Sequence, residues 1–311
     1  MPFKTLFGVT NLLKDYGVDA LRLRVFVNPP ASGIWEKEIT CMLGYNDKEH
    51  VLKMALRAKE LGFRIMVDFH YSDYFADPSV QIMPQAWQGH DFQELLADVY
   101  NHTTDVMQLL GRHGIVPEWV QIGNEINNGI MHPVGSAKDG FPKLAALLNR
   151  GYEATKAVSP ESKVITHLAE GQDPEASRYF FDQFLLQYGG KTDILGLSYY
   201  PYWIGSDYTV TMDKLKKNLY GLMERYGKDV MVCEIGGDEN DPDNSYAYAK
   251  AVIELVKGMP DNRGKGVFWW EPEGNSAFLP DRYPLGATRV VGEKELQFTR
   301  ALEAFRKAEG K

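Results

Sequence analysis

The sequence has few cysteines, no excess of positive charge and no long apolar run, and each shortage excludes a class of protein. Its 311 residues include only two cysteines, Cys41 and Cys233, so no disulfide framework holds the fold. The formal net charge of −8 leaves no surplus of cations for nucleic acid phosphates or an anionic membrane. No apolar run approaches the roughly 20 residues of a membrane-spanning helix. We therefore predict no nucleic acid partner and no membrane span.

Signals for targeting and for metal binding are also missing. Residues Met1–Lys4 lead directly into a helical pattern, without the apolar core of a signal peptide. Cys233 stands in an apolar run, where a small buried side chain is the expected role rather than a reactive thiol. No zinc spacing occurs, and the acidic loop Asp238–Asp243 does not match an EF-hand. We expect neither a metal nor a cofactor, with calcium the weaker alternative.

Composition and patterning indicate one globular domain. Hydrophobic residues make up 44% of the chain and charged residues 24%, as in soluble proteins. No low-complexity linker and no internal repeat divides the sequence. We expect a single domain over residues 1–311, large enough for a continuous core.

Short apolar runs alternate with longer stretches of helical periodicity. Seven runs are predicted strands: Leu21–Asn28, Arg64–Tyr71, Trp119–Glu125, Lys163–Ala169, Ile194–Tyr200, Val230–Ile235 and Gly266–Trp270. The predicted helices are Lys4–Tyr16, Asp47–Glu60, Phe92–Arg112, Phe141–Val158, Met212–Tyr226, Ser245–Lys257 and Glu293–Ala308. Uniformly apolar strands are typical of a parallel sheet covered by helices. The alternation predicts an α/β fold, either an open sheet or a closed barrel.

The connections favour the barrel. Helix-to-strand links are short and contain glycines suited to helix caps, at positions 17, 62 and 227. Strand-to-helix links are long: Pro29–Asn46, Ser72–Asp91, Ile126–Gly140, Gly236–Asn244 and Pro272–Gly292. One elaborated face is typical of a TIM (β/α)₈ barrel, whose site lies at the carboxyl ends of the strands. No glycine-rich phosphate fingerprint supports a dinucleotide-binding sheet.

The strand count differs from that of a complete barrel. Seven strands are found where eight are expected, because Lys4–Tyr16 reads as the helix that precedes Leu21–Asn28. Two alternatives are open: Phe3–Val9 supplies a poor first strand, or this chain lacks that strand.

Two carboxylates interrupt apolar strands at their carboxyl ends. Glu125 closes the run Gln121–Glu125, and Glu234 stands within Val230–Gly236. The two are 109 positions apart, which places them on strands that face each other across a barrel mouth. Glycoside hydrolysis requires at least two opposed carboxylates. One protonates the leaving oxygen, and the other attacks the sugar or activates water. Either alone could simply be a residue that ends a strand in an ion pair.

Aromatic and polar residues gather at the same strand ends. Sugar rings stack on aromatic faces, so the aromatics point to a carbohydrate: Trp87, Tyr199, Tyr200, Tyr202, Trp203, Trp269 and Trp270. Asp68 and His70 share a strand face by parity. We expect these two to form a hydrogen-bonded support for the site rather than to ligate a metal.

Several motifs of the chain resemble those of the endo-β-1,4-galactanases, glycoside hydrolase family 53, within a clan of retaining (β/α)₈ glycosidases. The resemblance covers roughly residues 10 to 275. It rests on these segments: Leu21–Pro29, Asp68–Asp73, Ala76–Pro78, Pro84–Trp87, Val120–Ile126, Leu195–Pro201, Val232–Glu234 and Phe268–Pro272. The pair Asn124-Glu125 indicates only the clan, whereas Asp68–Asp73 together with Ser198–Pro201 indicates the family.

The resemblance implies a role for each site residue. Glu125 is the acid/base and Glu234 the nucleophile, while Asn124 holds the sugar 2-hydroxyl. Arg24 and one of two tyrosines, Tyr199 or Tyr200, keep the nucleophile ionised. Residues expected to bind sugar or support the site are Trp270 as the floor of the −1 subsite, together with Asn28, Asp68, His70, Trp87 and His167.

The chain departs from the family pattern in two further places. Tyr74-Phe75 stands where Thr-Trp is usual, so a sugar-stacking platform is altered. The segment after Glu234 is an acidic Gly-Gly-Asp run without the usual aromatic residue, so the calcium sites of some relatives do not carry over.

The resemblance implies an endo-acting, retaining hydrolase of β-1,4-galactan, the side chain of type I arabinogalactan in pectin. Two alternatives are another β-1,4-linked polysaccharide as substrate, and an inactive carbohydrate-binding remnant if the barrel is truncated. We expect a monomer. The family also implies a secreted, periplasmic or cell-surface protein, although this chain shows no signal peptide.

Overall fold

The computed structural model describes residues 6–31, 34–35, 39–40, 44–279, 281–293 and 295–306. Cys41 and the start of the proposed weak strand, residues 3–5, lie outside these ranges. The chain divides into two compact units. The first unit comprises Ala20–Ala169 and Glu175–Gly196, and the second comprises Met1–Asp19, Glu170–Pro174 and Leu197–Lys311.

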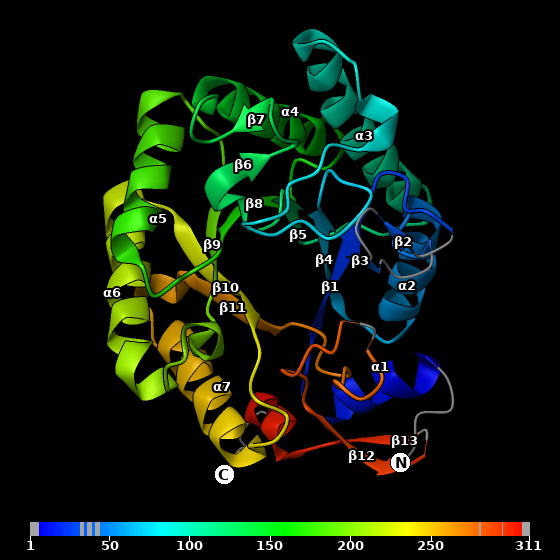
Figure 1. The fold of residues 1–311 in the computed structure, drawn as a ribbon, viewed down its shortest axis with the longest axis vertical. Coiled ribbons are helices and arrows are strands. Elements are labelled where there is room, and N and C mark those ends of the chain that lie inside the picture. Colours follow the sequence, from blue (N-terminus) through cyan, green and yellow to red (C-terminus); the bar gives the residue numbers. More distant parts are fainter. Residues whose placement is uncertain are drawn as a thin grey trace. The chain divides into compact units, whose positions relative to one another are not determined.

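The first unit is built on parallel strands that follow chain order (Figure 1). They are β1 (Ala20–Val25), β4 (Arg64–Phe69), β5 (Trp119–Ile122) and β8 (Lys163–Leu168). Arg24 pairs with Asp68, and Asp68 pairs with Gln121, so three polar residues lie at one level of the sheet. All four residues of β5 are buried, as expected of a central parallel strand.

Three long helices of the first unit begin at residues that satisfy their free amides. These helices are α2 (Lys48–Glu60), α3 (Phe92–Arg112) and α4 (Phe141–Val158). The Asp47 side chain accepts from the His50 amide at 2.8 Å. Asp91 and Glu94 form a reciprocal capping box at the start of α3. Pro142 occupies the first turn of α4, where no amide donor is needed. These helices confirm the sequence predictions to within a residue.

The second unit contains the parallel pair β10 (Asp229–Ile235) and β11 (Gly264–Trp269) with their helices. The helices are α1 (Leu6–Asp15), α6 (Tyr208–Tyr226) and α7 (Pro242–Lys257). Strand β9 (Ile194–Ser198) begins in the first unit and ends in the second. The sheet order is β1-β4-β5-β8-β9-β10-β11, which is chain order throughout, as in a βα barrel.

The predicted C-terminal helix Glu293–Ala308 is wrong. The segment forms an antiparallel pair, β12 (Thr288–Gly292) with β13 (Glu295–Phe298), and then the 3₁₀ turn Arg300–Phe305. Phe298 packs edge-on against Tyr16 at 5.7 Å between ring centroids. Good helix formers at 293–296 suggested the helix, but tertiary contacts with the N-terminal segment override local propensity.

Two further differences concern elements near polar loops. Helix α5 (Pro174–Phe181), continued by a π-helical turn over Asp182–Gln187, was not predicted. Helix α6 begins four residues earlier than predicted because Asp207 caps it, accepting from the Thr209 amide at 2.9 Å. The alternative of a strand over Phe3–Val9 is wrong for residues 6–9, which are helical.

Gly17 determines the short connection that follows α1. Its φ is +88°, and a Cβ there would lie 2.6 Å from the Phe305 carbonyl oxygen. Only glycine meets both demands. Glycines 62 and 227 also adopt positive φ after helices, as predicted.

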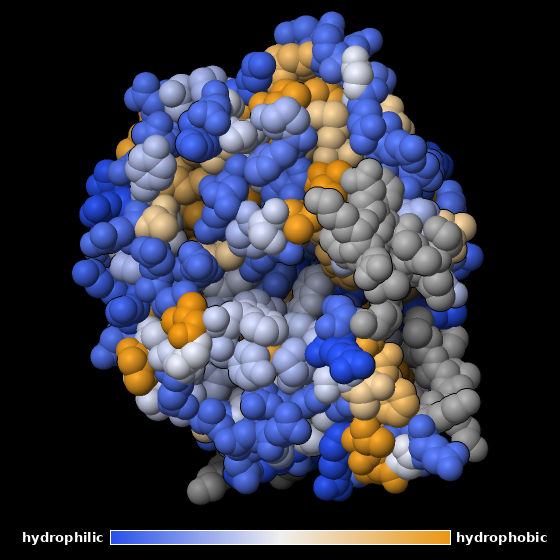
Figure 2. Space-filling view, viewed as in Figure 1, coloured by the Kyte–Doolittle hydropathy of each residue, from blue (hydrophilic) through white to orange (hydrophobic). Residues whose placement is uncertain are grey.

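Polar residues dominate the face shown in Figure 2, where apolar residues occur in small separate groups. None of the helices in the described parts of the chain combines the length and apolarity needed to cross a bilayer.

The capping box of α3 gives a test of the fold. We expect Asp91→Ala to lower the free energy of unfolding by about 1 kcal/mol, because two amides at the helix start lose their acceptor. Urea denaturation measures the change. Gln93→Ala, at an exposed position of the same turn, is the control and should leave the midpoint nearly unchanged. Equal effects of the two substitutions would contradict the role of the cap.

Candidate active site

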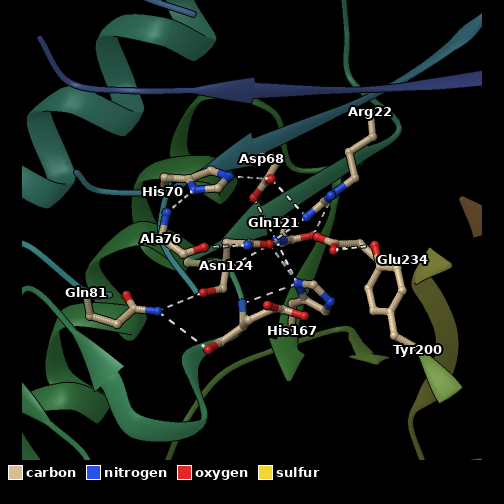
Figure 3. A network of polar contacts seen from close by, with 12 residues as sticks. Arg22, Asp68, His70, Ala76, Gln81, Gln121, Asn124, His167, Tyr200 and Glu234 are labelled. Atoms are coloured by element: carbon tan, nitrogen blue, oxygen red, sulfur yellow. Dashed lines mark hydrogen bonds and ion pairs between the residues drawn. The ribbon is translucent and has the colours of Figure 1, made fainter. Parts of the chain in front are cut away.

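Arg22 is the centre of a buried polar network in the first unit (Figure 3). Its Nη2 lies 2.9 Å from Asp68 Oδ2 and donates to Asn124 Oδ1 at 2.7 Å. Its Nε donates to Gln121 Oε1 at 3.1 Å. One guanidinium therefore joins the carboxyl ends of β4 and β5 to β1, using the planar array of donors that arginine alone provides.

Asp68 is fully buried and ionised. Burial alone would raise its pKa, but the Arg22 guanidinium and His70 outweigh that effect and hold the pKa below its ordinary value. The two carboxylate oxygens accept from different donors, since Gln121 Nε2 reaches Oδ1 at 2.7 Å and His70 Nε2 reaches Oδ2 at 3.0 Å. This carboxylate supports its neighbours rather than facing solvent.

His70 has both ring nitrogens engaged by the protein. The Ala76 amide donates to Nδ1 at 2.9 Å, which places the ring proton on Nε2, where it points to Asp68. The side chain is 1% exposed. The structure thus places His70 as a support beneath the site, which is one of the roles expected from the sequence.

The acid/base candidate, Glu125, follows directly on the buried Asn124. Asn124 donates from Nδ2 to the Ala76 carbonyl at 2.7 Å, and its Oδ1 accepts from Arg22. Its orientation is therefore determined at both ends of the amide. Glu125 is half-buried and has left-handed backbone angles, φ 47° and ψ 52°. A non-glycine residue in this region costs free energy and is typical of functional sites.

His167, at the end of β8, lies against the same group. Its Nδ1 is 3.1 Å from Gln121 Nε2 and 3.0 Å from Asn124 Oδ1, and the Glu125 amide donates to it at 3.4 Å. Burial, with the Arg22 charge adding to it, holds the pKa of His167 well below its ordinary value. A neutral imidazole therefore adjoins the Asn124-Glu125 peptide.

Asn28, Asp73 and Trp87 occupy the loops above β1 and β4. The Asn28 amide donates to Asp73 Oδ1 at 2.7 Å, and the Gln85 amide donates to Oδ2 at 2.8 Å. Asp73 thereby ties the Asn28 loop to the 3₁₀ turn Gln85–Trp87. The Asn28 side chain is exposed, whereas Trp87 is only 6% exposed and meets His102 edge-on.

Arg24 lies on β1, two residues beyond Arg22, with its guanidinium 4.7 Å above the Phe75 ring centroid. Phe75 is one of the two residues that replace the usual Thr-Trp. The altered segment thus keeps an aromatic face, but this face contacts an arginine.

The second unit holds the nucleophile candidate. Glu234 lies in β10 with 5% of its surface exposed, and the Tyr200 hydroxyl donates to its Oε2 at 3.1 Å. Tyr199, by contrast, is fully buried and its hydroxyl contacts Thr211 Oγ1 at 2.7 Å. Burial raises the pKa of Tyr199 to about 12. Tyr200 is therefore the tyrosine that serves the carboxylate, and Tyr199 is a core residue.

Close packing holds Tyr200 beside the end of β10. A Cβ at Gly236 would lie 3.0 Å from Tyr200 Cε1 and 2.6 Å from the Tyr283 hydroxyl, so a larger residue would displace the ring. The Trp270 amide donates to the Ile235 carbonyl at 2.9 Å, which places the half-buried Trp270 beside the end of β10.

The predicted site residues thus form two groups, one in each unit. The network of the first unit contains Asp68, His70, Asn124, Glu125 and His167. In the second unit, the end of β10 holds Glu234 and lies beside Tyr200 and Trp270. Sequence reasoning missed Arg22, Gln121 and Gln81 as members of the first group. Strand parity could have found Gln121, because it falls on the same face of the predicted strand Trp119–Glu125 as Glu125.

Comparisons with known proteins assign the chain to a family. The model of Glycosyl hydrolase family 53 matches residues 7–305. The chain belongs to this family. It is 34% identical over 297 residues to the "Probable arabinogalactan endo-beta-1,4-galactanase A" of Aspergillus terreus, covering 87% of this chain and 80% of the relative. It is 31% identical over 293 residues to the "Arabinogalactan endo-beta-1,4-galactanase A" of Emericella nidulans, covering 87% and 79%.

Solved structures agree with this family assignment. A structure from a study of two fungal β-1,4-galactanases matches with a TM-score of 0.80 at 27% identity, covering 96% of this chain and 90% of the other. The family 53 catalytic domain of Ignisphaera aggregans matches with a TM-score of 0.81 at 27% identity, covering 97% and 88%. The predicted TIM (β/α)₈ barrel is confirmed, with seven of its strands in the described residues, and the protein is a glycoside hydrolase.

The two tyrosines provide a matched pair of variants. We expect Tyr200→Phe to move the acidic limb of the pH–activity profile to higher pH, because loss of the hydroxyl donor raises the pKa of Glu234. Tyr199→Phe should leave that limb in place but lower the free energy of unfolding by about 1–2 kcal/mol, since Thr211 loses a buried partner. An unmoved limb in Tyr200→Phe would contradict the assignment of Tyr200 to the carboxylate.

Proposed function

We propose that this family 53 enzyme is an endo-acting hydrolase of β-1,4-galactan that works with retention of configuration. The observation that carries the proposal is the buried Glu234, held by the Tyr200 hydroxyl at 3.1 Å at the end of a strand. The phenol donor orients the carboxylate and favours its ionised form, as a nucleophile requires. The names of the relatives, arabinogalactan endo-β-1,4-galactanases, support the substrate.

In this proposal Glu125 is the acid/base and Glu234 the nucleophile. Glu125 protonates the departing glycosidic oxygen while Glu234 attacks the anomeric carbon and forms a glycosyl-enzyme. Glu125 then removes a proton from a water molecule that attacks the anomeric carbon. This attack breaks the bond to Glu234 and releases the sugar with its original configuration. A retaining mechanism needs the carboxyl groups about 5–5.5 Å apart. We propose that residues 1–311 act as a single catalytic domain.

The remaining residues have supporting or binding roles in the proposal. Asn124, oriented by Arg22 and Ala76, holds the sugar 2-hydroxyl, a contact that strengthens in the transition state. Trp270 is the floor of the −1 subsite, and the role of Arg24 is to keep the nucleophile ionised. Asn28 and Trp87 contact the glycan, while Asp68, His70 and His167 hold Asn124 and its neighbours. We propose that the reaction needs no metal or organic cofactor.

The proposal also concerns the partner, the oligomeric state and the location of the enzyme. Its partner is the polysaccharide, and the protein acts as a monomer. A substrate in plant cell walls requires that the enzyme be secreted, periplasmic or attached to the cell surface. Another β-1,4-linked polysaccharide remains the second candidate substrate, because the long strand-to-helix loops contact the sugar and differ from the family at Tyr74-Phe75.

Product release from β-1,4-galactan tests this function. We expect galacto-oligosaccharides of several lengths from the wild-type chain. Glu125→Gln should lower kcat about 10²- to 10⁴-fold, because the leaving oxygen loses its proton donor. Glu234→Gln should be at least as damaging, because no glycosyl-enzyme forms. Proton NMR of the first product should show the β-anomer.

Two controls complete this experiment. Glu60→Gln, at an exposed position near the end of α2, should keep full activity. Thermal melting shows whether each variant is folded. A folded wild-type chain that releases nothing from galactan would disprove the substrate; release from β-1,4-glucan or β-1,4-mannan instead would favour the second candidate. No release from any of them would leave a carbohydrate-binding protein without activity.

A further inference from the structure

The backbone at the acid/base candidate is strained. Gly123 has a φ of +81°, and Glu125 follows with φ 47° and ψ 52°. Glycine adopts positive φ freely, but the left-handed region is unfavourable for glutamate. This conformation persists only where surrounding contacts impose it. The direction of the Glu125 side chain depends on it, because φ and ψ determine where the Cα–Cβ bond points.

Gln81 makes contacts on both sides of Glu125. Its Nε2 donates to the Asn124 carbonyl at 2.9 Å and lies 3.5 Å from the Glu125 carbonyl. The same nitrogen donates to the Asp77 carbonyl at 3.0 Å. An amide nitrogen has two hydrogens, so one serves Asp77 and the other is shared by the two carbonyls beyond it. Figure 3 shows the Gln81 side chain directed at this peptide from the loop after β4.

The directions of these two carbonyls relative to each other depend on the backbone conformation of Glu125. The Asn124 carbonyl belongs to the peptide plane before Glu125, and the Glu125 carbonyl belongs to the plane after it. In helical conformations of either hand, successive carbonyls point in similar directions, whereas in extended backbone they alternate. A single donor can therefore face both carbonyls only while Glu125 stays out of the extended region.

The position of Gln81 is itself determined by a tight turn. Asp77 Oδ1 accepts from the Ser79 and Val80 amides at 2.6 and 2.9 Å, and the Asp77 and Val80 backbones exchange hydrogen bonds. The Gln81 carbonyl accepts from the His132 amide at 2.7 Å. Just before the turn, Ala76 binds His70 and Asn124. The segment Ala76–Gln81 thus contacts His70, Asn124 and Glu125 together.

The oxygen of the Gln81 side-chain amide is buried without a hydrogen-bond donor among the described residues. The side chain is 3% exposed, and Oε1 has no hydrogen-bond partner among the residues that the structure describes. A buried acceptor without a partner destabilises the folded state. An apolar residue of the same shape would avoid that cost. Fold stability therefore does not account for a glutamine here, whereas its donor contacts do.

We propose that Gln81 is a positioning residue that keeps the backbone of the acid/base Glu125 out of the extended region and so aims its carboxyl group at the glycosidic oxygen. The proposal rests on the proposed function of Glu125. Gln81 acts through the backbone and does not contact the substrate.

Gln81→Met tests the proposal, because methionine keeps the length of the side chain and removes both donors. We expect kcat on β-1,4-galactan to fall about 10- to 100-fold, as for a misplaced catalytic group, with KM little changed. The melting temperature should stay within a few degrees of the wild-type value. In a crystal structure of the variant, Glu125 should leave the region of positive φ. Gln93→Met, on an exposed face of α3, is the control and should match the wild-type protein.

Gln81→Glu supplies a second readout and replaces Gln81→Met if that variant fails to fold. The introduced carboxyl group can donate one hydrogen bond while it is protonated, but once ionised it repels the carbonyl oxygens. The activity of this variant relative to wild type should therefore rise as the pH falls. A wild-type kcat in Gln81→Met, a constant ratio across pH in Gln81→Glu, or an unmoved Glu125 backbone would each overturn the proposal. If wild type is inert on galactan while Glu125 moves in Gln81→Met, the proposed function fails and the backbone role of Gln81 stands.

Discussion

The buried ion pair between Arg22 and Asp68 is the interaction on which the rest of the first unit's site depends. Asp68 has no exposed surface, and only 6% of the Arg22 side chain is exposed. Burying either charge alone would cost several kcal/mol, so neither residue is tolerable without the other. Gln121 and His70 complete the coordination of the carboxylate at 2.7 and 3.0 Å. Removal of any one member would leave buried polar groups of the others without a partner, at a cost of about 1–3 kcal/mol for each group.

That network also explains how Asn124 is oriented. Parallel pairing places Asp68 opposite Gln121, and both lie next to the arginine that contacts Asn124 Oδ1. The chain then leaves β5 through Gly123 and Glu125, both at positive φ. Tyr71, Glu170 and Glu271, which follow β4, β8 and β11 by two residues, also have positive φ. Strain thus recurs at the carboxyl ends of the strands, where a barrel carries its chemistry.

The sequence predicts the parts of this arrangement that depend on local pattern. Apolar runs locate the strands, and an isolated carboxylate in such a run identifies Glu125 and Glu234. Strand parity pairs Asp68 with His70. Local pattern does not show that Arg22 meets Asn124, about a hundred positions away, or that Gln81 reaches the carbonyls beyond β5. The choice between Tyr199 and Tyr200 depends on packing around Thr211, and the C-terminal hairpin depends on contact with Tyr16.

The two proposed catalytic carboxylates are supported in different ways, and their chemistry accounts for the difference. A nucleophile must stay ionised, and Glu234 in β10 accordingly accepts a hydrogen bond on its own carboxylate. An acid/base gains and loses a proton in each cycle, so its carboxyl group must keep its direction in both protonation states. Gln81 and His167 contact the backbone of Glu125. Support through the backbone fixes direction without biasing the proton, which is the requirement for a group that acts first as an acid and then as a base.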